Sequence, residues 1–197
     1  RDAKGGFQAI DMDLLRKCPV ATWLCRPICQ SRQDIKVAVA IDPESPEPAA
    51  KALSIRMLEL SRSLADSCSG QLYIISCWDY PFETYLQGNA FVRVSDGDIA
   101  QAVIKAQDDH HAMLSGLMNE AKLGEQYELH HLRGKPAELI PDFAAKHDID
   151  ILVMGTLART GIAGFMIGNT AENIVQQLDC SLMALKPQGF VSPVKAY

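Results

Sequence analysis

The sequence lacks the features that mark membrane proteins, nucleic-acid-binding proteins and metal-binding ribbons. No apolar run in its 197 residues approaches the length of a membrane span, and the first residues do not resemble a signal peptide. It has 19 lysines and arginines against 24 aspartates and glutamates, with no basic block, so neither nucleic acid nor a membrane is an expected partner. Its six cysteines form no Cys-x-x-Cys pair, so we expect reduced thiols in a cytoplasmic protein.

Catalytic motifs are also missing. The chain has no Gly-x-x-x-x-Gly-Lys loop, no serine nucleophile elbow and no pair of carboxylates spaced to face one crevice. We therefore expect a binding protein rather than an enzyme, and a hydrolase or nucleotidyl transferase is the weakest of the function hypotheses.

From residue 35 onward, apolar strands alternate with amphipathic helices. Runs typical of buried strands cover residues 35–41, 72–78, 127–133, 149–154 and 181–185, and helices are predicted between them. This pattern predicts a doubly wound α/β fold, with a five-stranded parallel sheet and helices on both faces. Because the third run is interrupted by polar residues and suits an edge, the expected strand order is 3-2-1-4-5.

The second predicted helix begins after a cap at Ser95, and we expect one of its sides to face the core. The residues on that side are Ile99, Val103, Ala106, Met113, Leu117 and Ala121. Two histidine pairs, 110/111 and 130/131, are adjacent in sequence, and neighbours point apart on a helix or a strand. Neither pair therefore suits one metal ion, and we expect all four histidines on the surface.

In the expected sheet, the order in which successive strands are added reverses between strands 35–41 and 149–154. Ligands of such sheets bind at this switch point, beyond the carboxyl ends of the strands. Asp42 and Met154-Gly155 are the residues expected there. The later strand continues into a glycine-containing loop that opens a helix near Gly168, a geometry that presents backbone N–H groups to phosphate.

The loop resembles the nucleotide-binding motif of the universal stress protein family, which reads Gly, two residues, Gly, nine residues, Gly, then Ser or Thr. The four positions here are Gly155, Ala158, Gly168 and Asn169, so two of them depart from the pattern. Further stretches resemble the second domain of the tandem E-type members over residues 35–197: Arg133–Pro141, Arg159–Ile162, Gly168–Glu172 and Lys186–Val194.

Residues 11–19 resemble the end of the first domain of the same tandem proteins. We therefore expect residues 1–34 to be the C-terminal helix and strand of a preceding copy, and residues 35–197 to be a universal stress domain. The resemblance implies that two such domains pair through their last strands. We predict that residues 20–25 run antiparallel to residues 181–185, within one chain or across a dimer, with Trp23 packed at the junction.

The resemblance also implies a cytoplasmic stress-response protein with an adenine-nucleotide alpha-hydrolase-like fold. Its ligand would be ATP or another nucleotide, with Mg²⁺ accompanying the nucleotide and no other metal, and slow ATP hydrolysis stays open. The residues at the family's binding positions are Asp42, Met154, Gly155, Ala158, Gly168, Asn169 and Thr170. Arg159 and Lys135 are cationic residues near the expected crevice and are candidates to pair with phosphate.

The two departures keep a second hypothesis open. If the family's glycine at position 158 has a positive φ, Ala158 costs on the order of 1 kcal/mol there, and its methyl group narrows the phosphate site. Asn169 is a good helix cap, Glu172 completes a capping box, and Thr170 offers a hydroxyl one position later. The chain is therefore either a regulatory module that binds a nucleotide or small ligand, or a structural dimerisation domain with a degenerate crevice.

The segment 79–97 is long for a plain connection and rich in aromatic residues. Tyr80, Phe82, Tyr85 and Phe91 lie within it. It suits either a lid over an apolar ligand or an interface with another domain, and we favour the interface.

Overall fold

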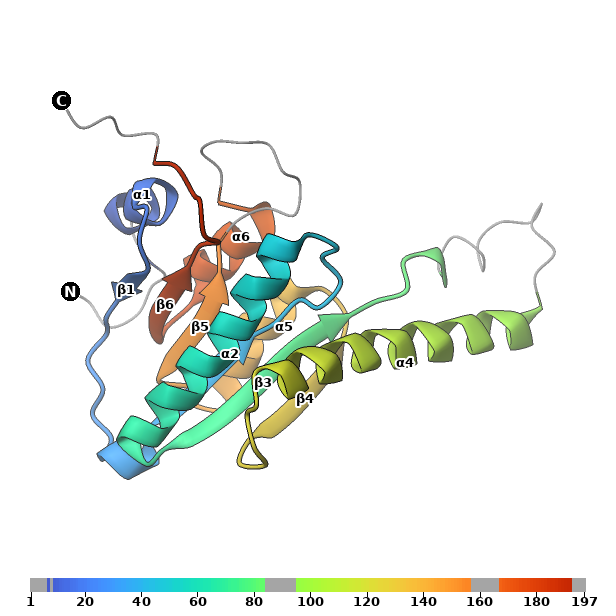
Figure 1. Cartoon of the computed structure of the whole chain (residues 1–197), viewed down its shortest axis with the longest axis horizontal. Helices are drawn as coiled ribbons and strands as arrows, with labels where there is room; N and C mark the ends of the chain where they lie inside the picture. Colours follow the sequence, from blue (N-terminus) through green and yellow to red (C-terminus); the bar gives the residue numbers. More distant parts are fainter. Residues whose placement is uncertain (1–6, 8, 84–94, 157–166, 193–197) are drawn as a thin grey trace.

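A six-stranded sheet organises the computed structural model, which describes residues 7, 9–83, 95–156 and 167–192 (Figure 1). The strand order is β1-β6-β5-β2-β3-β4. The strands are β1 (Thr22–Leu24), β2 (Lys36–Ala40), β3 (Gln71–Trp78), β4 (Glu128–Arg133), β5 (Ile151–Gly155) and β6 (Ser181–Leu185). The five strands from β2 to β6 are parallel, which confirms the predicted order and places the polar strand β4 at the edge.

The helices cover both faces of the sheet. They are α1 (Ala9–Lys17), α2 (Pro48–Cys68), α4 (Asp96–Glu120), α5 (Pro136–Lys146) and α6 (Asn169–Gln177), with a short 3-10 turn at Arg32–Asp34. One core cluster joins the sheet to α2 and α4, and the other joins it to α1, α5 and α6. Alternation along the strands feeds both clusters, since Ile151 and Val153 face α2 whereas Leu152 and Met154 face α6.

Helix α2 packs against β2 and β5, the two neighbouring strands at the centre of the sheet. It starts with Pro48 at its first turn and ends at Ser69, which has a left-handed φ of 56°. Gly70 follows because the chain passes close to β2 there: a Cβ at this position would lie 2.2 Å from the carbonyl oxygen of Ile35. The lack of a side chain at Gly70 therefore lets the chain pass close to Ile35 as it turns from α2 into β3.

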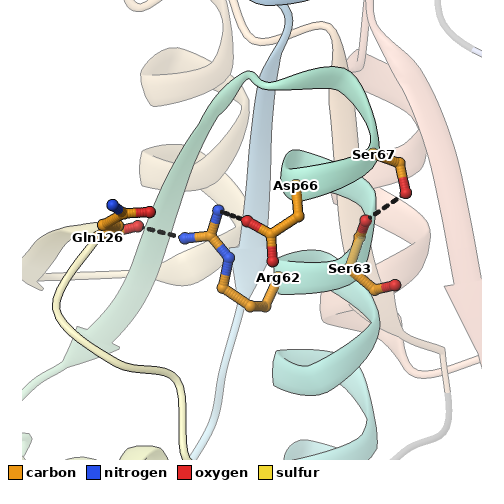
Figure 2. A network of polar contacts seen from close by, with 5 residues as sticks. All are labelled: Arg62, Ser63, Asp66, Ser67 and Gln126. Carbon is orange, nitrogen blue, oxygen red and sulfur yellow. Dashed lines mark hydrogen bonds and ion pairs between the residues drawn. The ribbon is translucent and has the colours of Figure 1, made fainter.

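An arginine holds α2 against the connection between α4 and β4 (Figure 2). The guanidinium of Arg62 donates to the carboxylate of Asp66 on its own helix and to the backbone carbonyl of Gln126. Only 16% of the Arg62 side chain is exposed, so these bonds pair a mostly buried charge, although its Nε atom has no partner among the described residues. Nearby, the Ser67 hydroxyl donates to the Ser63 carbonyl at 2.7 Å.

Helix α4 begins as predicted, but its buried side differs. The Ser95 hydroxyl accepts a hydrogen bond from the Asp98 backbone N–H, which confirms the cap. Met113, expected in the core, is 44% exposed, whereas Leu114 is fully buried. The prediction was wrong at Met113, whereas Ile99, Leu117 and Ala121 are buried as predicted.

The prediction that all four histidines lie on the surface holds for His111, which is exposed, but was wrong for His110, and His130 and His131 are partly buried. His110 is 1% exposed, and its Nδ1 atom lies 2.8 Å from Nε2 of His131 on β4. His130 points to the opposite face, where its ring centroid is 4.5 Å from that of Phe143 on α5. His130 and His131 do point apart, as expected, whereas the rings of His110 and His111 both lie near His131, at 4.9 and 5.5 Å between centroids. Because helices cover both faces of this edge strand, however, pointing apart does not mean pointing into water.

The N-terminal strand confirms its predicted partner within one chain. Strand β1 runs antiparallel to β6, with Trp23 opposite Met183 and Leu24 opposite Leu182. Leu24 is buried, whereas Trp23 is 45% exposed and packs only in part. Strand β1 therefore extends the sheet by one strand and covers the edge that β6 would otherwise present.

Candidate functional site

The switch point lies between β2 and β5, at the carboxyl ends of two neighbouring parallel strands. Ala40 is in register with Met154, so the residues that follow each strand emerge at the same edge of the sheet. Asp42 is half-buried there, and its Oδ1 atom accepts the backbone N–H of Glu44 at 3.2 Å. The structure thus brings Asp42 together with the end of β5, as the sequence predicted.

At the end of β5, Met154 and Gly155 contribute backbone rather than side chains. Met154 is 4% exposed and packs in the core on the α6 side. A Cβ on Gly155 would lie 3.3 Å from Leu53 Cδ2 and 3.8 Å from Met57 Sδ, both on α2. The missing side chain of Gly155 therefore lets α2 approach the sheet closely, which is a packing demand on this glycine.

Thr156 is a residue of this edge that the sequence analysis did not single out. It is fully buried; its N–H donates to the Leu185 carbonyl at 3.2 Å, and its carbonyl accepts the Gly168 N–H at 2.9 Å. These two bonds hold both ends of the glycine loop at the sheet. Among the described residues, its hydroxyl has no hydrogen-bond partner. The sequence feature that could have identified Thr156 is its polar side chain directly after a buried strand.

Helix α6 starts differently from the prediction. Gly168, not Asn169, is the N-cap: its backbone is extended, and its carbonyl accepts the Glu172 N–H at 2.8 Å. Asn169 is the first helical residue and is exposed, as is Thr170. The predicted capping box was wrong because the helix begins at Asn169, one residue earlier than a cap at Asn169 requires.

Without that box, the first turn of α6 carries no side-chain cap, since glycine has no side chain to offer. The backbone N–H groups of its first residues therefore point out of the helix with the positive end of its dipole. The Glu172 carboxylate is held elsewhere, because Arg16 of α1 donates to its Oε1 at 2.6 Å. The N-terminal segment thereby neutralises the acidic side chain of the turn that the loop enters.

Of the remaining candidates, Ala158 and Arg159 lie outside the described residues, as do Tyr85 and Phe91. Lys135 follows β4, two strands from β2, and its Nζ lies 3.5 Å from Glu138 Oε1 on the surface. Tyr80 and Phe82 follow β3 with their ring centroids 6.0 Å apart, and Phe82 is 61% exposed.

The described part of the chain contains no group of three or more His, Cys, Asp or Glu residues arranged to hold a metal ion. Within the same residues, no helix is long and apolar enough to cross a membrane.

Comparison with known proteins gives matches over most of the chain. A model of the universal stress protein family matches residues 35–186. Universal stress protein E of Escherichia coli K12 is 29% identical over 191 residues, which are 96% of this chain and 58% of that protein. The chain therefore spans a little over half the length of this curated relative.

Solved structures show the same fold. A universal stress protein from Pseudomonas aeruginosa UCBPP-PA14 superimposes with a TM-score of 0.70 at 23% identity, over 93% of this chain and 58% of that one. A universal stress protein in complex with cAMP has a TM-score of 0.50 at 17% identity, over 77% and 95% of the two chains. The architecture is the adenine nucleotide alpha hydrolase-like fold that was expected.

Proposed function

The chain belongs to the universal stress protein family, and we propose that it is a cytoplasmic regulatory module of the stress response that binds a nucleotide between β2 and β5. The complex of a structural relative with cAMP supports a nucleotide as the class of ligand. The longer relatives support a second proposal, that residues 1–34 end a preceding universal stress domain.

The uncapped first turn of α6 is the observation that carries this proposal. It follows the glycine loop at the switch point, and a helix end of this kind binds phosphate through backbone N–H groups and the helix dipole. The loop's ends are fixed by the two backbone bonds of Thr156, so the turn is held at the edge that also carries Asp42. The ion pair between Arg16 and Glu172 removes a repulsive charge from that turn.

In this arrangement each group has a distinct role. Asp42 accepts hydrogen bonds from a ribose or a base, and Gly168 and Thr170 admit phosphate oxygens at the start of α6. The buried Thr156 hydroxyl gains the partner that it lacks among the described residues. A nucleotide would bring Mg²⁺ with its phosphates.

The pairing of β1 with β6 favours a second candidate, a structural domain that joins universal stress domains through this edge. The two candidates differ in what they require of the crevice. A structural domain would keep its stability and assembly when the crevice is altered, and it would not respond to nucleotide.

A titration with AMP, cAMP, ADP and ATP, each with and without Mg²⁺, tests the proposal by thermal shift and calorimetry. A nucleotide at 100 times its dissociation constant should raise the free energy of unfolding by about 2.7 kcal/mol, which is roughly 5–11 °C in Tm. No shift at millimolar concentration of any of them would leave the structural candidate standing.

Variants locate the site. Asp42→Asn should weaken binding about tenfold, because it removes a charged acceptor, whereas Asp179→Asn at the opposite edge of the sheet should not. Thr156→Val should weaken nucleotide binding without lowering the stability of the free protein, since its hydroxyl has no partner to lose among the described residues. Ala158→Gly restores the family's glycine and should tighten binding.

A further inference from the structure

A cavity of about 240 Å³ lies at the carboxyl end of β6, outside the switch point. Three parts of the chain meet there: the segment that leads into β1, helix α2, and the turn that follows β6. The side chains that shape it include Val20, Arg56, Lys186, Gln188 and Phe190. None of Asp42, Thr156 and Gly168 lines it, so it is a separate feature of the same sheet edge.

The lining of this cavity is positively charged. Among the described residues it contains Arg56 and Lys186 and no aspartate or glutamate, although the chain as a whole carries a net charge of −5. Arg56 is exposed on α2 and makes no ion pair with any residue that the structure describes. The two cations come from segments 130 residues apart, so the fold rather than a local motif brings them together.

Lys186 is the less ordinary of the two cations because it is 7% exposed. Its ammonium donates to the backbone carbonyl of Cys18 and lies 4.1 Å from the centroid of the Phe190 ring. Burial lowers the pKa of Lys186, and the acidic group that opposes this effect is the Cys18 thiol rather than a carboxylate. An ammonium has three donors, and no carboxylate among the described residues pairs with this one, although a buried charge without a counter-ion is costly.

We propose that this cavity binds a small phosphate-type oxyanion, either inorganic phosphate or the phosphate of a small phosphomonoester. A phosphate dianion matches the two positive charges, and the Arg56 guanidinium supplies a paired set of donors for its oxygens. The volume falls below the range of about 300–1,000 Å³ that is usual for drug-sized ligands, so a whole nucleotide does not fit. The bound anion would join α2 to the turn after β6.

Phosphorus-31 NMR and calorimetry with inorganic phosphate, at constant ionic strength set by sodium chloride, test the proposal. Arg56→Gln should weaken phosphate binding about tenfold, since it removes charge-assisted hydrogen bonds from an exposed position. Lys51→Gln is the matched control, because it removes the same charge from the same helix outside the cavity, and its affinity should stay within about twofold of wild type. Lys186→Met should abolish binding, provided that its circular dichroism and Tm show a folded protein.

Amide chemical shifts separate this site from the nucleotide crevice. Phosphate should shift the signals of Gln188 and Phe190 and leave those of Thr156 and Gly168 in place. Shifts confined to Thr156 and Gly168, equal affinities of the Arg56 and Lys51 variants, or no binding at millimolar phosphate would each overturn the proposal. A parallel titration with glycerol phosphate identifies the source, because a phosphomonoester ligand should bind more tightly than inorganic phosphate.

Discussion

Replacing Leu15 by alanine tests whether α1 is an integral part of the fold. Leu15 is 1% exposed and packs with residues of α6 and β1 in one core cluster, whereas its neighbour Leu14 is 47% exposed. Leu15→Ala should lower the free energy of unfolding by about 2–5 kcal/mol, through lost transfer energy and the cavity left behind. That corresponds to roughly 4–20 °C in Tm for a chain of this length. Leu14→Ala should change stability by about 0.5 kcal/mol or less.

Urea unfolding followed by circular dichroism measures both variants. A core that includes α1 predicts one transition, with a lower midpoint for Leu15→Ala and an unchanged slope. Equal midpoints for the two variants would refute the docking of α1. A separate early transition that alone responds to Leu15→Ala would show that α1 unfolds independently of the sheet. Either result would also remove Arg16 as a lasting partner of Glu172.

Three further predictions follow from the packing. Burial lowers the pKa of His131, and the neighbouring histidines add to this effect. Because acid protonates this histidine in the unfolded chain first, its contribution to stability should be full above about pH 6.5 and be lost as the pH falls. His131→Gln should flatten this loss in a series of denaturation curves at different pH. Burial raises the pKa of the Cys180 thiol to about 11, so iodoacetamide at pH 8 should alkylate it far more slowly than the exposed Cys25. Mass spectrometry measures both rates, and equal rates would contradict the burial of Cys180. Gly70→Ala places a Cβ 2.2 Å from a backbone oxygen and should cost about 1–3 kcal/mol, whereas Gly116→Ala, on an exposed turn of α4 with open space around it, should stabilise by about 0.5–1 kcal/mol in the same urea titration.

The order of the sheet was accessible from the sequence because each strand carries its own evidence. The run from Ile151 to Met154 is apolar at every position, as a central strand covered on both faces must be, and the polar residues from His130 to Arg133 mark an edge. Once the strands are ordered, their carboxyl ends meet without further information, so Asp42 and Gly155 were placed at one edge correctly.

The second strand pairing was accessible for a different reason. Residues 20–25 alternate in the manner of a strand, and their resemblance to a family's last strand named Ser181–Leu185 as the partner. Alternation alone would not have chosen between an edge of this sheet and another molecule. The resemblance named the partner strand but left pairing within one chain or across a dimer open, and the structure places β1 on β6 of the same chain.

The tertiary structure decided which faces are covered and which charges meet. His110 is buried against His131 of β4, whereas Met113 on the same helix is exposed. No local pattern records where two elements cross, since that depends on the summed shape of all the side chains between them. The sequence by itself determined the strands, their order and the edge of the sheet that carries both Asp42 and the start of the glycine loop. Only the folded chain brought Arg16 to Glu172 and Arg56 to Lys186, because the proximity of charges far apart in sequence depends on packing rather than on periodicity.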